Sequence, residues 1–382
     1  MAVERPAAGI PAISAEETMP AAGHAEETMA AAAQASGDAR TAPAWQIQAG
    51  RREERLGAAA AAATAVLFGS SYVATAVALR SFTPLATAGW RGLLASLAVA
   101  AALATGALGP RPARPTLGQV ARLAVLALVG GPVFIVAMNV AVDHAGATIT
   151  SFVAGLYAVL AAALAPLVLR ERLSRTAAAG FVLALAGTAL LAQLRLSGSA
   201  VEGIGTGLLA ALSYALFLVL SRRWSVPWAL PGSLITLAMA LGTGVPIAAW
   251  LVLSDPAALV PPVIRPDAAA ALVWLGVAPG AIAPVLLVAA VRRLDARRSS
   301  AYLLLNPVSA ALLSPVVLGE WLQPDQLLGG LLVLAGIAAA SGAVGSRADG
   351  RSSRFGPPND ALGGGALHEQ REQHHPEGDL LE

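Results

Sequence analysis

The sequence predicts an all-α integral membrane protein with ten transmembrane helices, arranged as two inverted five-helix repeats with both termini in the cytoplasm. Three observations lead to this prediction. The composition is too apolar for a soluble chain, ten long segments carry almost no charge, and part of the chain is duplicated.

The composition excludes an ordinary soluble protein. Of the 382 residues, 56% are hydrophobic and 13% are charged, and the mean hydropathy is +0.67, whereas a soluble chain has roughly 25% charged residues. All 25 basic residues are Arg, scattered in ones to fours between apolar segments. This pattern is typical of membrane edges, so we expect the lipid bilayer and no nucleic acid as a partner. The absence of Cys excludes disulfides and Cys nucleophiles.

Both ends of the chain are polar and lack apolar periodicity. Residues 1–55 and 346–382 are therefore predicted to be disordered cytoplasmic tails. No apolar segment opens the chain, so no cleavable secretory signal is expected. The adjacent His374 and His375 lie in the second tail, where a solvated pair is more typical than a metal site, and we expect no metal and no cofactor.

Ten uncharged segments lie between the tails, interrupted only by Arg91, and each can span about 30 Å of hydrocarbon as a helix. They are residues 56–79, 81–110, 123–142, 144–169, 176–194, 203–221, 224–254, 268–291, 299–319 and 326–346. Their continuous Ala- and Leu-rich composition disfavours strands, which would alternate.

The distribution of arginine supports the count of ten and orients the chain. With a cytoplasmic N-terminus, the inner side carries eighteen arginines and the outer loops carry three, Arg80, Arg195 and Arg265. Adding or removing one span would invert every later loop and destroy this asymmetry. We therefore expect a multi-pass protein of the cytoplasmic membrane.

An internal repeat divides the chain into two halves. A shift of 149 residues aligns residues 123–189 with 272–338 without a gap, with 24 identities in 67 positions. We assign residues 56–195 and 200–345 to the two repeats, each with five helices. Because five is odd, the second repeat enters the membrane upside down, an architecture that recurs among secondary transporters.

Several short motifs resemble those of EamA-type transporters of the drug/metabolite transporter superfamily. Phe68-Gly69-Ser70-Ser71-Tyr72-Val73-Ala74 and Trp90-Arg91-Gly92-Leu93-Leu94 are similar to the first two helices of that family. Leu305-Asn306-Pro307-Val308, Leu318-Gly319-Glu320 and Leu334-Ala335-Gly336 are similar to its ninth and tenth helices. The resemblance covers about residues 57–345 and implies a ten-helix carrier that exports amino acids or other small metabolites.

Arg91 is the only charge well inside a predicted span. A central Arg costs on the order of 3 kcal/mol on insertion scales, so we expect it to face protein or water. The sequence leaves two roles open for it. It is either a counter-ion for a substrate carboxylate or phosphate, or a structural tie to backbone carbonyls or helix C-termini.

Paired helix interruptions and a set of polar aromatic residues complete the candidate site. The third span contains Gly130, Gly131 and Pro132, and the matched place in the eighth span contains Pro279 and Gly280, with Pro284 following. Such Pro–Gly positions predict bent helices with a ligand site or close packing between them. The candidate substrate-binding residues are Arg91, Tyr72, Tyr157, Tyr214, Trp274, Tyr302 and Asn306. For each of them a packing or interfacial role is the alternative.

These features favour a secondary transporter that moves a small molecule, an amino acid or related compound, by alternating access, with export as the expected direction. No enzyme motif and no phosphate-binding loop is present. A passive channel or a non-transporting membrane scaffold or regulator stays open as the alternative, as does a homodimer. No Asp or Glu lies in a predicted span core, which favours facilitated efflux or exchange over carboxylate-based proton antiport.

Overall fold

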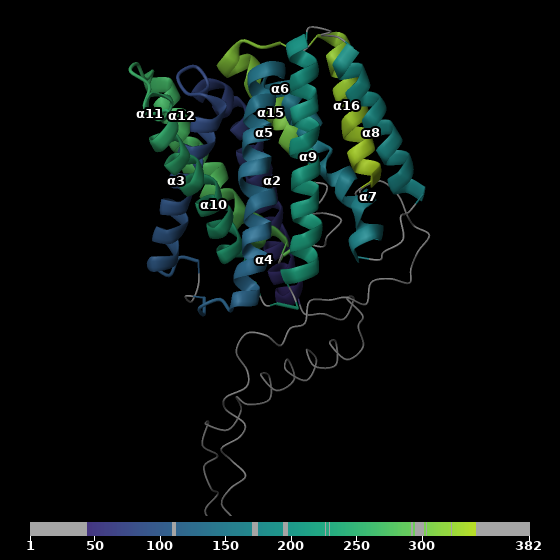
Figure 1. Ribbon diagram of the computed structural model, residues 1–382. Helices are drawn as coiled ribbons and strands as arrows, with labels where there is room; N and C mark the ends of the chain where they lie inside the picture. The colour runs from purple at the N-terminus through teal and green to yellow at the C-terminus, as the bar shows by residue number, and fades with distance from the viewer. Residues whose placement is uncertain are drawn as a thin grey trace, which may run out of the picture. The chain divides into compact units, whose positions relative to one another are not determined.

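The structure, a computed structural model, describes residues 44–108, 112–169, 175–193, 198–225, 227–228, 230–291, 293–294, 302, 304–321 and 323–340. Every regular element within these ranges is a helix, and the helices run side by side in one bundle (Figure 1). His374, His375 and most of both predicted tails lie outside the described residues.

The first repeat contains α2 to α8 and the second contains α9 to α16. The first set is α2 (Ala44–Ala78), α3 (Pro84–Ala104), α4 (Leu117–Leu128), η1 (Val129–Val133), α5 (Phe134–Ala145), α6 (Ala147–Gly155), α7 (Tyr157–Leu169) and α8 (Arg175–Gln193). The second set is α9 (Gly198–Ser225), α10 (Gly232–Ser254), α11 (Pro256–Leu259), α12 (Pro266–Val277), η2 (Ala278–Ile282), α13 (Ala283–Val291), α15 (Leu305–Leu318) and α16 (Pro324–Ala340).

Local sequence sets the starts of two of these helices. Thr83 caps α3 by accepting a hydrogen bond from the Ala86 amide at 3.2 Å, and Pro84 fills the first helical position, where no amide hydrogen is needed. Thr116 and Gln119 form a reciprocal capping box at the start of α4. Each cap satisfies amides that the helix itself leaves free.

Each uncharged segment of the sequence contains an apolar helix. Seven helical segments are long and apolar enough to cross a membrane: Arg52–Ala78, Pro84–Ala104, Leu117–Ala145, Ala147–Leu169, Val201–Ser225, Gly232–Ser254 and Pro266–Ala290. Three more apolar helices are shorter, Arg175–Leu191, Leu305–Leu318 and Pro324–Ala340. At 1.5 Å per residue the shortest of these does not reach across about 30 Å of hydrocarbon, so the count of ten spans stays a prediction.

The first helix begins earlier than the sequence predicts. α2 starts at Ala44 and so includes the last residues of the segment 1–55 that the sequence assigns to a tail. Contacts with the end of α13 help to explain the extension. The Arg293 guanidinium donates to the Glu53 carboxylate at 2.8 Å, and Gly57 packs closely against Arg293 and Leu294.

The contacts between helices of the two repeats form a symmetric pattern. α3 packs against α10 and α8 against α16, and each pair joins helices that hold the same place in the two halves. α9 packs against α5 and α7, while α2 packs against α13 and α15, so the first helix of each half contacts the third and fourth helices of the other. Two halves related by a two-fold axis produce this pattern.

Glycines let α8 and α16 approach closely. A Cβ atom added to Gly180 would lie 2.5 Å from the Gly336 carbonyl oxygen, and one added to Gly187 would lie 2.7 Å from the Gly329 carbonyl oxygen. Gly180 aligns with Gly329 in the repeat, and Gly187 aligns with Gly336. The two contacts therefore exchange when the halves are swapped, and the equivalent helices α8 and α16 are antiparallel, as inverted repeats require.

Loops contact helix starts at both ends of the bundle. In the α2–α3 loop, Arg80 donates to the Asp267 carboxylate of α12 at 3.0 Å. At the opposite end, Gln119 of α4 donates to the Trp228 carbonyl in the α9–α10 loop at 2.8 Å. Asp267 is the repeat equivalent of Gly118, which packs against the Trp228 ring. The loop after the first helix of each half thus contacts the start of the third helix of the other half, at opposite ends of the bundle.

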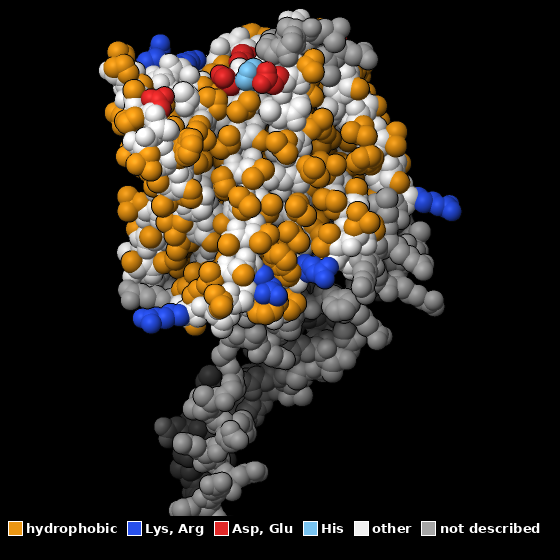
Figure 2. Space-filling view, in the orientation of Figure 1, with side chains coloured by type: hydrophobic (Ala, Val, Ile, Leu, Met, Phe, Trp, Pro, Cys, Tyr) orange, Lys and Arg blue, Asp and Glu red, His pale blue; other side chains and the backbone are white. Residues whose placement is uncertain are grey.

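The outside of the bundle is apolar. Leu253, Val316 and Leu167 are 86%, 82% and 79% exposed, and apolar side chains cover the face seen in Figure 2, with the described charged side chains near the helix ends. An exposed apolar surface of this extent is unfavourable in water and matches the hydrocarbon core of a bilayer. The fold is that of a multi-pass membrane protein.

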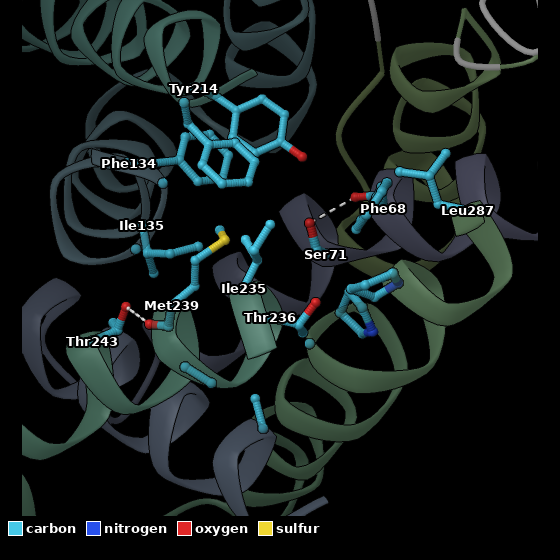
Figure 3. Close-up of a pocket in the computed structure, with 18 of the residues that line it drawn as sticks. Phe68, Ser71, Phe134, Ile135, Tyr214, Ile235, Thr236, Met239, Thr243 and Leu287 are labelled. Atoms are coloured by element: carbon cyan, nitrogen blue, oxygen red, sulfur yellow. Dashed lines mark hydrogen bonds between the residues drawn. The ribbon is translucent and has the colours of Figure 1, made fainter. Parts of the chain in front are cut away.

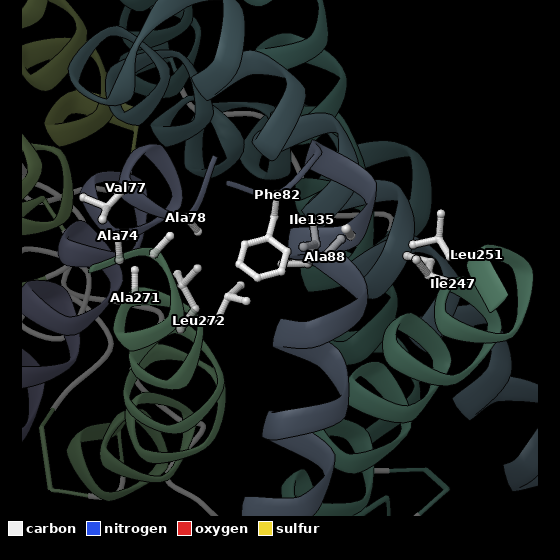
Figure 4. Packing of buried hydrophobic residues seen from close by; sticks show 13 residues of the cluster. Ala74, Val77, Ala78, Phe82, Ala88, Ile135, Ile247, Leu251, Ala271 and Leu272 are labelled. Atoms are coloured by element: carbon white, nitrogen blue, oxygen red, sulfur yellow. The ribbon is translucent and has the colours of Figure 1, made fainter. Parts of the chain in front are cut away.

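A hydrophobic cluster fills the end of the bundle where α2 ends and α12 begins. Phe82 lies in its middle, with Ala78 and Leu272 on one side and Ala88 and Ile135 on the other (Figure 4). The Trp90 indole donates to the Leu259 carbonyl at 2.9 Å beside it. This cluster, which we call the Phe82 cluster, packs α2, α3, α5, α10 and α12 together.

Candidate functional site

The third and eighth helices are both interrupted by a π-helical turn. η1 covers Val129–Val133 and η2 covers Ala278–Ile282, so the second turn lies 149 residues after the first, which is the shift of the repeat. Gly131 has non-helical backbone angles, φ −97° and ψ −106°. Proline lacks the amide hydrogen that an α-helix needs at this point, and Pro132 and Pro279 lie in the two turns. Both interruptions are therefore encoded by Pro and Gly.

Between the two turns lies a cavity of about 330 Å³. Residues from both repeats line it, and it is within the size range of small-molecule sites. Figure 3 shows part of the lining, with the rings of Tyr214 and Phe134 on one wall and the side chains of Ile235 and Met239 facing them. The cavity is thus formed at the interface of the two repeats.

Four aromatic rings form a continuous wall of this cavity. The Tyr214 ring centroid lies 4.7 Å from that of Phe134, 5.0 Å from that of Tyr157 and 5.3 Å from that of Phe217. The Tyr157 ring meets Tyr214 edge to face, at an interplanar angle of 81°, a favourable arrangement for aromatic pairs. In the first helices of the halves a shift of 142 residues aligns Ser71 and Tyr72 with Ser213 and Tyr214. Tyr72, the repeat equivalent of Tyr214, is also buried and lines the cavity.

Arg91 is the one cation among the lining residues that the structure describes, and no acidic residue is among them. Its side chain is only 8% exposed, and its Nη1 atom is buried without a hydrogen-bond partner in the described part of the chain. The neighbouring Gly92 meets the backbone of Gly244, which holds α3 against α10 and fixes the position of Arg91. Any tie of Arg91 to the described part of the chain leaves this nitrogen unused, and the counter-ion role stays a prediction.

Asn306 also lines the cavity and has a buried side-chain acceptor. It lies in the first turn of α15, is 6% exposed, and its Oδ1 atom has no hydrogen-bond partner in the part of the chain that the structure describes. A Cβ atom on Gly69 would come within 2.5 Å of the Asn306 carbonyl oxygen, so α15 lies tightly on α2. Asn306 is therefore held in place by its backbone while its side-chain oxygen stays unsatisfied.

The structure brings most of the predicted site residues together, but two aromatic candidates lie elsewhere. Trp274 is 45% exposed on α12, and its indole donates to the Ser70 hydroxyl at 3.0 Å on the outside of the bundle. Tyr302 packs against Ala61 and Leu294 at the end of α13. Neither Trp274 nor Tyr302 is among the residues that line the cavity. Of the predicted helix-break residues, Gly130, Gly131, Pro279, Gly280 and Pro284 line the cavity and Pro132 does not.

Several lining residues are missing from the sequence prediction. Phe134 and Phe217 complete the aromatic wall, and Met239 and Thr243 of α10 form the facing side. A signal exists for Phe217, since it lies three residues after Tyr214 on the same helix face. No charge or polar cluster marks Met239, so composition alone gives no reason to select it.

The cavity extends toward one end of the bundle only. Ser221, Thr236 and Val288, which line it, lie in the last turns of α9, the first turns of α10 and the last turns of α13. The exposed Gly232 at the start of α10 also belongs to the lining. At the other end the Phe82 cluster fills the space between α2, α3, α5, α10 and α12.

Two equivalent serines differ in their hydrogen bonds. Ser213 on α9 donates to the Val129 carbonyl, the first residue of η1, at 2.6 Å. Its repeat equivalent, Ser71 on α2, donates instead to Phe68 of its own helix at 2.6 Å, rather than to Ala278 in η2. The scaffold is two-fold, but the two interrupted helices are tied to their neighbours differently.

Comparison with known proteins agrees with this architecture. The model of the family described as "EamA-like transporter family" matches residues 55–193 and 201–342. A solved crystal structure of another protein has a TM-score of 0.54 and 22% sequence identity to this chain, covering 75% of this chain and 98% of the other. At that identity the likeness shows the fold alone. No curated protein sequence gives a significant match.

Proposed function

The chain belongs to the EamA-like transporter family of membrane transporters, and from this premise we propose that it is a secondary transporter of a small metabolite, with the central cavity as its substrate site. One observation carries the proposal. A cavity lined by both repeats holds a single buried cation whose Nη1 atom has no protein partner among the described residues. Such a group is costly to keep unless it serves a ligand.

Alternating access is the mechanism that this geometry supports best. In the state described here the cavity extends to the end where α9 finishes, and the Phe82 cluster fills the opposite end. Two halves in opposite orientations can exchange their conformations, so the second state follows from the first by symmetry. A passive channel or a non-transporting scaffold is the alternative.

The proposed topology has ten spans, both termini in the cytoplasm and a location in the cytoplasmic membrane. It is supported by the arginines. Arg122, Arg222 and Arg223 lie at the end toward which the cavity extends, and Arg80 and Arg265 lie at the other. The positive-inside rule then makes the cavity accessible from the cytoplasm, which suits export. The lining residues that the structure describes include no carboxylate for a proton relay, so we propose facilitated efflux or exchange.

Counterflow in liposomes tests the proposal. Vesicles that contain the purified protein and a high internal concentration of unlabelled substrate are diluted into labelled substrate, and a carrier accumulates label transiently. We expect saturable counterflow that disappears with Arg91→Gln. A flux that grows linearly with concentration would indicate a channel, and no flux for any compound of a broad metabolite panel would indicate a scaffold.

A further inference from the structure

The polar groups of the cavity are unbalanced in charge, and this narrows the class of ligand. Arg91 contributes one positive charge, and no Asp, Glu or His is among the lining residues that the structure describes. A zwitterion bound here would pair its carboxylate with Arg91 and leave its ammonium group in an apolar site without a carboxylate. A buried unpaired charge is strongly unfavourable. A ligand with one negative charge leaves the filled cavity neutral.

The same count argues against phosphate esters. A phosphate group carries close to two negative charges and is usually bound by several cationic or amide donors. Arg91 alone supplies the cationic donors among the described lining residues. Its fork geometry fits a carboxylate, which takes two parallel hydrogen bonds from one guanidinium.

Asn306 determines which second polar group a ligand of this cavity should carry. The residue lines the same cavity, and its Oδ1 atom is buried and has no partner in the described part of the chain. An acceptor of this kind needs a hydrogen-bond donor on the ligand. A neutral hydroxyl or amide N–H satisfies it without adding charge, whereas an ammonium group would bring the unpaired charge that the site cannot balance.

The side chains that form the cavity walls indicate the shape of the rest of the ligand. Phe134, Tyr157, Tyr214 and Phe217 form a ring-on-ring wall with centroid separations of 4.7 to 5.3 Å. Met239 and Ile235 face it. Aromatic rings bind other rings by stacking or edge contact, and Met adapts to their outline. The space between these walls suits a flat apolar group.

We propose that the cavity binds aromatic monocarboxylates whose second polar group is a neutral hydroxyl or amide N–H, and that it discriminates against zwitterionic amino acids of the same shape. The carboxylate pairs with Arg91, the neutral donor with Asn306, and the ring packs on the Tyr214 wall. This inference rests on the proposed function for its biological meaning, but its binding test does not require transport.

A set of ligands on one carbon skeleton tests the proposal. Labelled 3-phenyllactate is bound to the purified full-length protein in detergent, and 3-phenylpropionate, phenylalanine, phenylalanine amide and 2-phenylethanol compete for it. We expect 3-phenyllactate to bind best, 3-phenylpropionate to be several-fold weaker, and phenylalanine to be at least about tenfold weaker. Phenylalanine that competes as well as 3-phenyllactate, or the absence of saturable binding, would overturn the proposal.

Variants assign the two contacts. Asn306→Leu should lower the affinity for 3-phenyllactate to that for 3-phenylpropionate. An equal loss of affinity for both ligands would show that Asn306 does not bind the hydroxyl group. Arg91→Gln should abolish the advantage of the carboxylates over 2-phenylethanol. Trp274→Phe, on the outside of the bundle, is the matched control and should leave the order unchanged. If Arg91→Gln does not give monodisperse protein, the order of ligands on the unmodified chain still decides the proposal.

Counterflow separates this inference from the proposed function. Saturable counterflow of phenylalanine without that of 3-phenyllactate would keep the transporter and overturn the ligand class. Binding in the expected order with no counterflow of any ligand would keep the ligand class and overturn the transporter.

Discussion

Arg91 and Thr243 precede the two glycines that meet where α3 and α10 cross. The same place at this crossing therefore carries a guanidinium in one half and a hydroxyl in the other. Thr243 donates to the Met239 carbonyl of its own helix at 2.7 Å, so its donor is used within the protein. At this crossing the two halves therefore differ in charge.

Replacing that cation by another tests whether its shape matters as well as its charge. Arg91→Lys keeps the positive charge but loses the planar fork, so we expect carboxylate affinity to fall about tenfold while the preference for anions over neutral ligands is kept. Competition binding and melting temperature, measured on the same preparation, check this. An equal fall for charged and neutral ligands that follows the melting temperature would indicate a structural tie.

Residue chemistry predicts which groups are unusual more readily than it predicts where they point. Arg91 and Asn306 stand out because each is polar inside an apolar run, and both line the cavity. Trp274 is an equally plausible residue type, yet its helix turns it outward. Met239 is missed because nothing in an apolar run marks one apolar residue, and only the crossing of α3 and α10 places it.

The two π-helical turns are the elements most clearly encoded by sequence. Gly131 and Gly280 are related by the repeat shift and each adjoins a Pro, which predicts an interruption in both helices, and η1 and η2 lie there. The different use of Ser213 and Ser71 is not predictable, because both follow the same Ser–Tyr pattern. It depends on how closely α9 and α2 approach the carbonyls of the two turns.

Removing each serine hydroxyl should therefore have unequal effects. Ser213→Ala deletes a hydrogen bond between α9 and η1 and should lower the free energy of unfolding by about 1 kcal/mol, whereas Ser71→Ala deletes one within α2 and should change it less. Melting temperatures of the two variants in one detergent check this. Equal shifts would show that the Ser213–Val129 bond does not stabilise this state.

The crossing of α8 and α16 leaves no room for a side chain. Gly180→Ala would bring its Cβ within 2.5 Å of the Gly336 carbonyl oxygen, so the backbones must separate, and we expect destabilisation of about 1–3 kcal/mol. Gly205→Ala on α9 is the matched control, because a Cβ there meets nothing within 4 Å. It should be neutral or slightly stabilising. Similar melting temperatures for both variants would contradict the close crossing.

At the scale of the whole molecule, the sequence predicts the repeats and the membrane class but not how the halves interlock. Composition and the 149-residue shift are sufficient to predict the membrane class and the repeats. That the first helix of each half packs on the third and fourth helices of the other depends on side-chain fit along whole helices. A hydropathy pattern contains no such information.

The orientation of the molecule is testable with single cysteines, since the chain has none of its own. In intact cells, Cys at Arg80 or Arg265 should react with an impermeant maleimide, and Cys at Arg114 or Arg223 should react only after permeabilisation. Labelling of the second pair in intact cells would reverse the proposed topology. The Arg80–Asp267 ion pair is exposed, so its replacement should leave the fold intact.

The contacts of Gly180 with Gly336 and of Gly187 with Gly329 have a consequence for the ancestry of such a scaffold. Because the repeat equates Gly180 with Gly329 and Gly187 with Gly336, two identical half-length chains inserted in opposite directions would make both contacts with these two glycines alone. Gly180 of each copy would meet Gly187 of the other. Covalent fusion of the copies adds nothing to this crossing. What fusion permits is divergence, and a cation can then be kept in one half and omitted from the other.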